Sequence, residues 1–338
     1  MPRFLARAAR PVSGERLVVV WRVTTRCNLS CGFCAYDRRL AIPRSEVDEA
    51  AARRVALALA AHGQRTARQI HLSLLGGEPF LWRPLANVAA DFARLGLSLG
   101  ITTNGTALSA ASAQQLLLEH FDEVTVSVDG LAETHDRLRG WAGGLAQLGR
   151  SLRALAEAKK ARGRGPVLRV NTVLMRDNVS QLAELGRMLA DWGVEELTFN
   201  RLGERDRPEF FAQHRLGVGA LEGLARLLPA LRVELAQRGL KLRGSDTYVR
   251  RLLELERGLP TGGSLCDPGA EFLFLDEQGR SAPCSFTLDD LGQPWPTNQH
   301  ELVGLPKRFL LQQSAGMTAC RDCRSTQVAG KFREPDGP

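Results

Sequence analysis

The chain has 338 residues, of which 44% are hydrophobic, 24% charged and 6% aromatic. This composition is typical of a globular protein with a sizeable core and excludes a largely disordered chain. The formal net charge of +8 is spread along the chain without an aromatic-interleaved basic stripe, so we expect no nucleic-acid partner.

The first 15 residues are basic and lack the sustained apolar core of a signal peptide. No apolar run approaches the roughly 18–20 residues that a membrane span needs, so we expect no membrane association. These features predict a cytoplasmic protein. In that compartment cysteines are more often metal ligands than disulfides, which makes all seven cysteines candidate ligands.

A run of apolar residues near 16–24 predicts a buried strand, and three cysteines follow it directly. Cys27, Cys31 and Cys34 are spaced C-x3-C-x2-C. Thiolates are the soft ligands that iron–sulfur clusters bind, whereas a zinc site more often uses paired C-x2-C units. Three thiolates on one loop would hold three irons of a cubane [4Fe–4S] cluster and leave the fourth iron open for another molecule.

Strands and helices alternate after this loop. Further strands are predicted near 69–75, 97–103, 123–128, 167–174 and 195–200. Amphipathic helices are predicted near 45–62, 83–95, 109–119, 144–162 and 178–192. This order predicts an α/β protein with a parallel sheet and right-handed crossovers, in which a ligand binds at the carboxyl ends of the strands.

Polar motifs follow most of the predicted strands. They are GGEP at 76–79, TNG at 103–105, SVDG at 127–130 and HDRLRG at 135–140, together with Asn171. With the cysteine spacing, and with Phe33 before the last cysteine, this series resembles the radical S-adenosylmethionine (SAM) superfamily over roughly residues 15–205. The resemblance implies a partial (β/α)6 TIM-type barrel.

The resemblance also implies a cofactor and a reaction. A [4Fe–4S] cluster would bind SAM through its open iron, and reduction would cleave SAM to methionine and a 5′-deoxyadenosyl radical, which abstracts a hydrogen atom from the substrate. Glu78, with the backbone of Gly76 and Gly77, would hold the methionine ammonium, unless it is an ordinary turn carboxylate. Phe33 would contact the adenine.

Four further residues are candidates for the same SAM site. Ser127 and Asn171 would reach the ribose or the carboxylate of SAM, or else are ordinary hydrogen-bonded residues at strand ends. Asn104 is expected to fix a turn or to line the pocket. Arg139 could pair with the SAM carboxylate through its two-pronged guanidinium, or belong to a surface ion pair.

The C-terminal third differs in character from the part before it. After a break near 203–210, helices are predicted near 217–238 and 246–257. We interpret 1–205 as the barrel, 206–260 as a helical linker region, 261–325 as a cysteine-bearing domain and 326–338 as a mobile tail.

Four cysteines lie in this C-terminal part: Cys266, Cys284, Cys320 and Cys323. The first two enclose Gly279 in the pattern C-x12-G-x4-C, which resembles the start of the SPASM and shorter twitch extensions of radical SAM enzymes. The resemblance implies an auxiliary iron–sulfur cluster, and four cysteines fit one [4Fe–4S] cluster but not the two of a full SPASM extension. A four-cysteine zinc site is the alternative.

An auxiliary cluster beside the substrate would accept an electron from the substrate radical. With loss of a proton, the result is a two-electron oxidation that gives dehydrogenation or a bond-forming cross-link. Asp246 and Tyr248 are candidate proton acceptors, and Arg201 is a candidate to orient an anionic group of the substrate. By analogy with SPASM and twitch relatives, the leading hypothesis is oxidative modification of a peptide in natural-product maturation.

Two other functions stay open. One is dehydrogenation or epimerisation of a small molecule such as a sugar or aminocyclitol. The other is a non-catalytic iron–sulfur electron carrier or a zinc-stabilised binding protein, against which the GGEP motif argues because a carrier needs no SAM pocket. Ligation of all seven cysteines would leave no thiol to donate a hydrogen atom in an epimerisation. The expected electron donor is of the flavodoxin or ferredoxin type.

Overall fold

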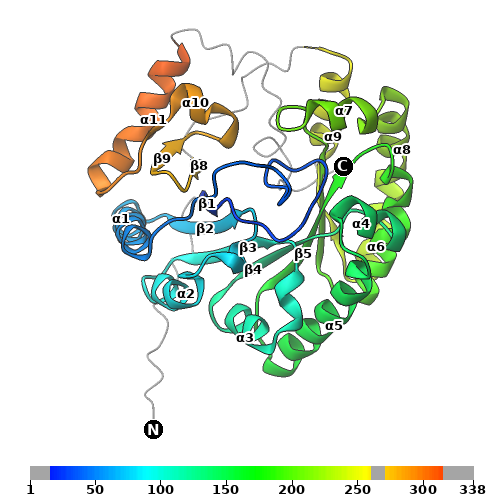
Figure 1. Cartoon of the computed structure of the whole chain (residues 1–338), viewed down its shortest axis with the longest axis horizontal. Helices are drawn as coiled ribbons and strands as arrows, with labels where there is room; N and C mark the ends of the chain where they lie inside the picture. The colour runs from blue at the N-terminus through cyan, green and yellow to red at the C-terminus, as the bar shows by residue number, and fades with distance from the viewer. Residues whose placement is uncertain (1–15, 260–270, 315–338) are drawn as a thin grey trace.

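A computed structural model describes residues 16–259 and 271–314 (Figure 1). In this part of the chain ten strands form one sheet, in the order β10-β9-β8-β1-β2-β3-β4-β5-β6-β7. The sheet curves so that the helices α1 to α6 lie along its outer side, and the loop after β1 runs from that strand toward α7 (Pro208–His214) (Figure 1).

The six predicted strands are confirmed, each to within one residue at either end. They are β1 (Arg16–Thr24), β2 (Gln69–Gly76), β3 (Ser98–Thr103), β4 (Glu123–Ser127), β5 (Val167–Leu174) and β6 (Glu196–Arg201). All five neighbouring pairs among them are parallel. The fold class predicted from the alternation, a mixed α/β protein with a largely parallel sheet, is therefore correct.

Helices connect these strands and cover the outer face. They are α1 (Glu49–Thr66), α2 (Leu85–Arg94), α3 (Ala111–His120), α4 (Ala132–Arg139), α5 (Gly144–Arg162) and α6 (Leu182–Asp191), with short 3-10 turns η1 (Pro79–Leu81), η2 (Thr106–Ser109) and η3 (Val179–Gln181). α1 begins four residues later than predicted, because Asp48 caps it by accepting a hydrogen bond from the Ala51 amide over 2.9 Å. α4, in the HDRLRG motif, was not predicted as a helix.

Burial alternates along the strands. On β1, Val19, Trp21 and Val23 are fully buried under the outer helices, while Val18 and Arg22 point to the inner face. Apolar side chains on the outer face supply the main driving force for the fold, because they leave water when the helices pack on the sheet. The inner face is left for polar groups and a ligand.

Charged residues of the inner face meet at the amino ends of the strands. Arg169 on β5 contacts Glu123 on β4 over 2.8 Å and Glu196 on β6 over 2.5 Å, and Arg16 on β1 also reaches Glu123. Although burial would raise the pKa of Glu123, the charges of His71, Arg169 and Arg16 lower it to about 2. This network occupies the amino ends of the strands. A ligand is therefore expected at the opposite edge, where the strands have their carboxyl ends.

The C-terminal elements extend the same sheet at both edges. They are α7 (Pro208–His214), α8 (Val218–Gln237), β7 (Lys241–Leu242), α9 (Asp246–Glu256), β8 (Phe272–Leu275), β9 (Arg280–Ala282), η5 (Ser285–Thr287), α10 (Leu288–Leu291), β10 (Gln293–Pro294) and α11 (Gln299–Ser314). β7 joins β6, and β8 joins β1 in parallel. The predicted helices near 217–238 and 246–257 are confirmed, while the predicted domain boundaries stay predictions.

Among the described residues, no helix is both long enough and apolar enough to cross a membrane.

Candidate active site

The first cysteine loop, residues 25–45, runs from the end of β1 to the start of α1. Its two ends are tied together, because the Thr25 amide donates to the Ser45 carbonyl over 2.9 Å and the Ser45 amide donates to the Thr25 hydroxyl over 2.8 Å. Inside the loop, the Arg44 guanidinium donates to four carbonyl oxygens, those of Thr25, Tyr36, Asp37 and Leu40. The loop is therefore held in one shape by its own hydrogen bonds.

All three thiols of this loop have polar neighbours. Asn104 Nδ2 lies 3.9 Å from the Cys27 sulfur, Arg139 Nη1 lies 3.9 Å from the Cys31 sulfur, and the Tyr36 amide donates to the Cys34 sulfur over 3.4 Å. Burial raises the pKa of each thiol, that of Cys34 to about 12. A cationic metal centre would reverse this effect, because it binds the thiolate directly.

The donor set fits a cluster better than a single ion. Within the described ranges, no three His, Cys, Asp or Glu side chains converge as one metal ion requires. A cubane cluster needs no such convergence, because each thiolate binds a different iron. Three thiols on a loop fixed by its own hydrogen bonds, with amide or guanidinium donors near all three sulfurs, suit that role.

The glycines of the GGEP motif let the end of β2 touch the chain that enters the cysteine loop. The Gly77 amide donates to the Thr24 carbonyl over 2.8 Å, and the Glu78 amide donates to the Arg26 carbonyl over 2.7 Å. A Cβ atom on Gly76 would lie 2.2 Å from the Thr24 oxygen, and one on Gly77 would lie 2.1 Å from the Arg26 oxygen. No larger residue fits at either position.

Glu78 joins three of the sequence motifs. Its carboxylate is only 1% exposed and accepts hydrogen bonds from the Phe80 amide (3.1 Å), the Thr103 hydroxyl (2.7 Å) and the Asn104 amide (2.7 Å). Burial raises its pKa, and these three donors oppose the rise. The side chain of Asn104 in turn contacts Asn28 on the cysteine loop over 2.9 Å.

Ser127 and Asn171 lie side by side. They are direct partners in the register of β4 and β5, at the carboxyl end of the inner face, and both are partly exposed. Asn171 also accepts a hydrogen bond from the Thr198 hydroxyl over 3.0 Å. The structure therefore brings together two of the predicted SAM contacts from neighbouring strands.

Arg139 makes a buried ion pair, not a surface one. Its Nη2 lies 2.6 Å from Oδ2 of Asp129, which is fully buried. The guanidinium also lies 5.3 Å from the centre of the Phe33 ring, and Phe33 packs against Phe210 of α7. Phe33, Arg139 and the cysteine loop thus form one contact group, in which Asp129 and Phe210 are partners without a predicted role.

The structure does not support the predicted proton acceptors. Asp246 is the first residue of α9, is exposed and pairs with Arg232 over 2.7 Å. Tyr248 is fully buried on the outer side of the sheet, and its hydroxyl donates to the Phe199 carbonyl over 2.9 Å. Both residues lie on the outer side of the sheet, because α9 covers β6 there through the Phe199 and Tyr248 rings.

Arg201 does lie at the carboxyl end of β6, but its charge is matched within the chain. Its Nη1 lies 3.0 Å from Glu256 Oε2, and the two side chains are 8% and 2% exposed. Arg215 also contacts Glu256. A substrate anion would have to compete with this carboxylate for Arg201.

Of the C-terminal cysteines, only Cys284 lies within the described residues. It is buried, and its sulfur is 3.5 Å from the Thr287 hydroxyl. The predicted ligands Cys266, Cys320 and Cys323 lie outside the described residues, as does the predicted tail at 326–338.

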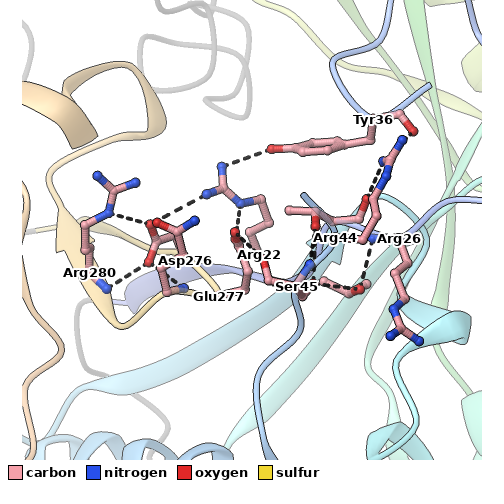
Figure 2. A network of polar contacts seen from close by, with 11 residues as sticks. Arg22, Arg26, Tyr36, Arg44, Ser45, Asp276, Glu277 and Arg280 are labelled. Carbon is pink, nitrogen blue, oxygen red and sulfur yellow. Dashed lines mark hydrogen bonds and ion pairs between the residues drawn. The ribbon is translucent and has the colours of Figure 1, made fainter. Parts of the chain in front are cut away.

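Three residues in or next to the cysteine loop were not predicted from the sequence: Arg22, Tyr36 and Glu277 (Figure 2). Arg22 contacts both of the others, over 2.5 Å to Glu277 and 3.0 Å to the Tyr36 hydroxyl. A signal for Arg22 was present, because it interrupts an otherwise apolar buried strand and a charge there needs a partner.

Comparison with known protein families gives a match that covers half of the chain. The model of the radical SAM superfamily matches residues 21–189. The chain is 32% identical over 198 residues to a pre-heme d1 synthase of Dinoroseobacter shibae, covering 57% of this chain and 46% of that protein. It is 31% identical over 283 residues to a PqqA peptide cyclase of Xanthomonas euvesicatoria, covering 81% of this chain and 70% of that protein. The chain thus spans about half of the first relative and more of the second.

Two solved structures have a similar fold. Streptococcus suis SuiB bound to its precursor peptide SuiA superposes with a TM-score of 0.65 at 17% identity, over 94% of this chain and 72% of SuiB. The protein anSMEcpe with bound AdoMet gives a TM-score of 0.64 at 16% identity, over 94% of this chain and 92% of that one.

Proposed function

The chain belongs to the radical SAM superfamily of enzymes, whose members use a [4Fe–4S] cluster and SAM, and from that premise we propose that it oxidatively modifies a peptide substrate. The geometry that carries the proposal is the fixed loop of Cys27, Cys31 and Cys34 at the carboxyl ends of the strands, next to the GGEP turn.

The cluster and SAM, when bound, supply a carbon-centred radical that removes a hydrogen atom from the substrate. The chain's own residues bind and orient. In this proposal the three thiols hold the cluster, and the buried carboxylate of Glu78, oriented by its three hydrogen-bond donors, takes the SAM ammonium. Ser127 and Asn171 hold the ribose or carboxylate from the strand ends.

Aromatic and apolar side chains keep water from this side of the site. Phe33 and Phe210 pack against a buried cluster formed by Leu138, Met175, Leu202 and Phe211. An apolar surface of this kind suits a radical intermediate, because exclusion of water suppresses side reactions.

A peptide is the preferred substrate class for two reasons. A relative that is similar over 81% of this chain is a PqqA peptide cyclase, and SuiB and anSMEcpe, which share the fold, are solved with bound peptides. In addition, two arginines near the carboxyl ends of β1 and β6, Arg22 and Arg201, already form ion pairs with Glu277 and Glu256. An anionic group of a small substrate would have to compete with these carboxylates.

A small-molecule substrate is the second candidate. The observation that favours it is the 32% identity to a pre-heme d1 synthase. Peptide and small molecule are separated by incubating the anaerobic protein with the peptides encoded beside its gene and with candidate small molecules, and by following the substrate-dependent rise in SAM cleavage.

We further propose one auxiliary [4Fe–4S] cluster on Cys266, Cys284, Cys320 and Cys323, which accepts the second electron, and a flavodoxin or ferredoxin as the reductant. The test is the iron and sulfide content of anaerobically reconstituted protein and of a variant with Cys27, Cys31 and Cys34 changed to alanine. About eight irons in the native protein and about four in the variant, with SAM cleavage only in the native form, are expected. About four and none, with zinc present, would refute the auxiliary cluster.

A further inference from the structure

A network of side chains joins the first cysteine loop to the hairpin of β8 and β9 (Figure 2). Arg22 donates from Nε to Glu277 over 2.5 Å and from Nη1 to the Tyr36 hydroxyl over 3.0 Å, and its Nη2 lies 3.6 Å from Asp276. The guanidinium also lies 5.9 Å and 5.6 Å from the ring centres of Tyr36 and Phe274. One cation therefore contacts both segments.

The network holds the loop at two places. Glu277 accepts a hydrogen bond from the Ser45 hydroxyl over 3.1 Å, at the point where Ser45 closes the loop onto Thr25. At the other place, the amide of Tyr36 donates to the Cys34 sulfur over 3.4 Å. A shift of the network would therefore move the Tyr36 amide, which donates to the Cys34 thiol that we assign to the cluster.

On its other side the network belongs to the segment that carries Cys284. β8 runs parallel to β1 with Leu275 opposite Trp21, which brings Asp276 alongside Arg22. β9 then ends at Ala282, and Cys284 follows two residues later. The network therefore connects the loop that carries three thiols with the hairpin that leads to Cys284.

Because the charges that join them are buried, the cysteine loop and the β8–β9 hairpin stabilise each other. The side chain of Glu277 is 2% exposed, that of Asp276 is fully buried and that of Arg22 is 16% exposed. The charges balance, since Arg280 makes a further ion pair with Asp276. A buried carboxylate that loses its cation is strongly disfavoured, so the arrangement is stable only when loop and hairpin are both in place.

We propose that Arg22 and Glu277 are positioning residues that lock the first cysteine loop to the β8–β9 hairpin, so that the loop keeps its SAM-binding geometry only while the hairpin is docked. The proposal rests on the proposed function, because it assigns the C-terminal hairpin a role at the SAM site. It does not require that the auxiliary cluster exist.

The test uses full-length, anaerobically reconstituted protein with Glu277→Gln or Arg22→Met. Three quantities are measured: iron content, hydrogen–deuterium exchange of residues 25–45, and SAM binding from the change it causes in the electron paramagnetic resonance signal of the reduced cluster. We expect unchanged iron, faster exchange in the loop and about tenfold weaker SAM binding. Arg22→Lys should restore part of both effects, because lysine keeps the charge but not the forked contact with Glu277 and Tyr36.

The matched control is Glu196→Gln. Glu196 is also a largely buried acid with two arginine partners, Arg169 and Arg243, but it lies at the opposite end of the sheet. This variant should lose stability while exchange in 25–45 and SAM binding stay as in the native protein. If Glu277→Gln does not fold, Ser45→Ala removes one contact of the same carboxylate and should loosen the loop by a smaller amount.

Native-like exchange and SAM binding in a folded Glu277→Gln protein would overturn the proposal. So would an equal change in Glu196→Gln, because the effect would then reflect general stability. Failure of the proposed function looks different: native protein that cleaves no SAM refutes the function, whereas the exchange of residues 25–45 in the variants still decides whether the lock exists.

Discussion

Arg139 and Asp129 form a buried ion pair beside the first cysteine loop, with 2.6 Å between Nη2 and Oδ2. The pair is tied to its surroundings on both sides. Asp129 Oδ1 accepts a hydrogen bond from the Val173 amide over 2.8 Å, and the carbonyl of Arg139 lies 3.8 Å from the Cys31 sulfur. It therefore links the end of β4, the strand β5, the helix α4 and the cysteine loop.

We predict that Asp129→Asn lowers the free energy of unfolding by about 3–5 kcal/mol, because it leaves the buried guanidinium of Arg139 without its counter-charge. The double variant with Arg139→Met should recover part of this loss, since it removes the unpaired charge. Urea denaturation of the three proteins measures both effects. A loss below about 1 kcal/mol in the single variant would contradict the assigned burial of the pair.

Glu78→Gln should lower SAM cleavage about 100-fold with unchanged iron content, because an amide provides one acceptor oxygen and no charge for the SAM ammonium. Thr103→Val is the control, because it removes one donor to Glu78 and keeps the carboxylate. If Thr103→Val lowers cleavage as much as Glu78→Gln, the role of Glu78 is to hold the turn and not to bind SAM.

Gly77→Ala should cost several kcal/mol of stability, since the added methyl would lie 2.1 Å from the backbone oxygen of Arg26, which cannot move away as a flexible side chain would. Gly223→Ala on α8 is the matched control. Nothing lies within 4 Å of a Cβ there, so alanine should stabilise the helix by about 0.5–1 kcal/mol. Thermal unfolding of both variants checks the contrast.

Tyr248→Phe should cost about 1 kcal/mol of stability, the worth of its hydrogen bond to the Phe199 carbonyl, and should leave SAM cleavage and product formation unchanged. A tenfold or larger loss of product formation at unchanged stability would restore the catalytic role that the sequence suggested for this residue.

Acid should destabilise the protein between pH 6.5 and about 4. Burial lowers the pKa of His71 from 6.5 to about 4 and that of His135 to about 3. Both are therefore neutral in the folded state while the unfolded chain takes up protons, so stability is complete above pH 6.5 and falls as the pH drops. The lowered pKa of Glu123, about 2, extends the loss below pH 4.5. Urea midpoints across this range measure the slope, and His71→Gln should reduce it.

Much of the fold was predictable because its signals are local. The alternating burial on β1 and the apolar periodicity of α5 each follow from the order of consecutive residues, and the predicted bounds of both are confirmed. The helix α4 was missed because its sequence is mostly polar, and only tertiary contacts bury His135, Leu138 and Arg139. The start of α1, by contrast, follows from a local signal, the capping contact of Asp48 with the Ala51 amide three residues later.

In the candidate site, too, local features were predictable and features that depend on tertiary contacts were not. Cysteine spacing and strand-end motifs lie within short segments, and the structure places Ser127 next to Asn171 and Glu78 next to Asn104 as parallel strands require. The structure gives both candidate proton acceptors other partners, which the sequence could not reveal because it does not say which face of a packed helix a residue occupies. Tyr248 lies between α9 and the outer side of β6, where its hydroxyl donates to the Phe199 carbonyl, and no local pattern distinguishes that position from one inside the site.

The sequence by itself determined the order of strands and helices, the three-thiol loop and the motifs at the strand ends, because each depends on residues close together in the chain. Only the tertiary structure decided which charges meet. Arg22 and Glu277 are 255 residues apart and become partners because β8 pairs with β1. Glu256 reaches Arg201 because α9 packs beside β6. Such pairs depend on distance in space, and burial makes each charge depend on the partner that folding brings to it.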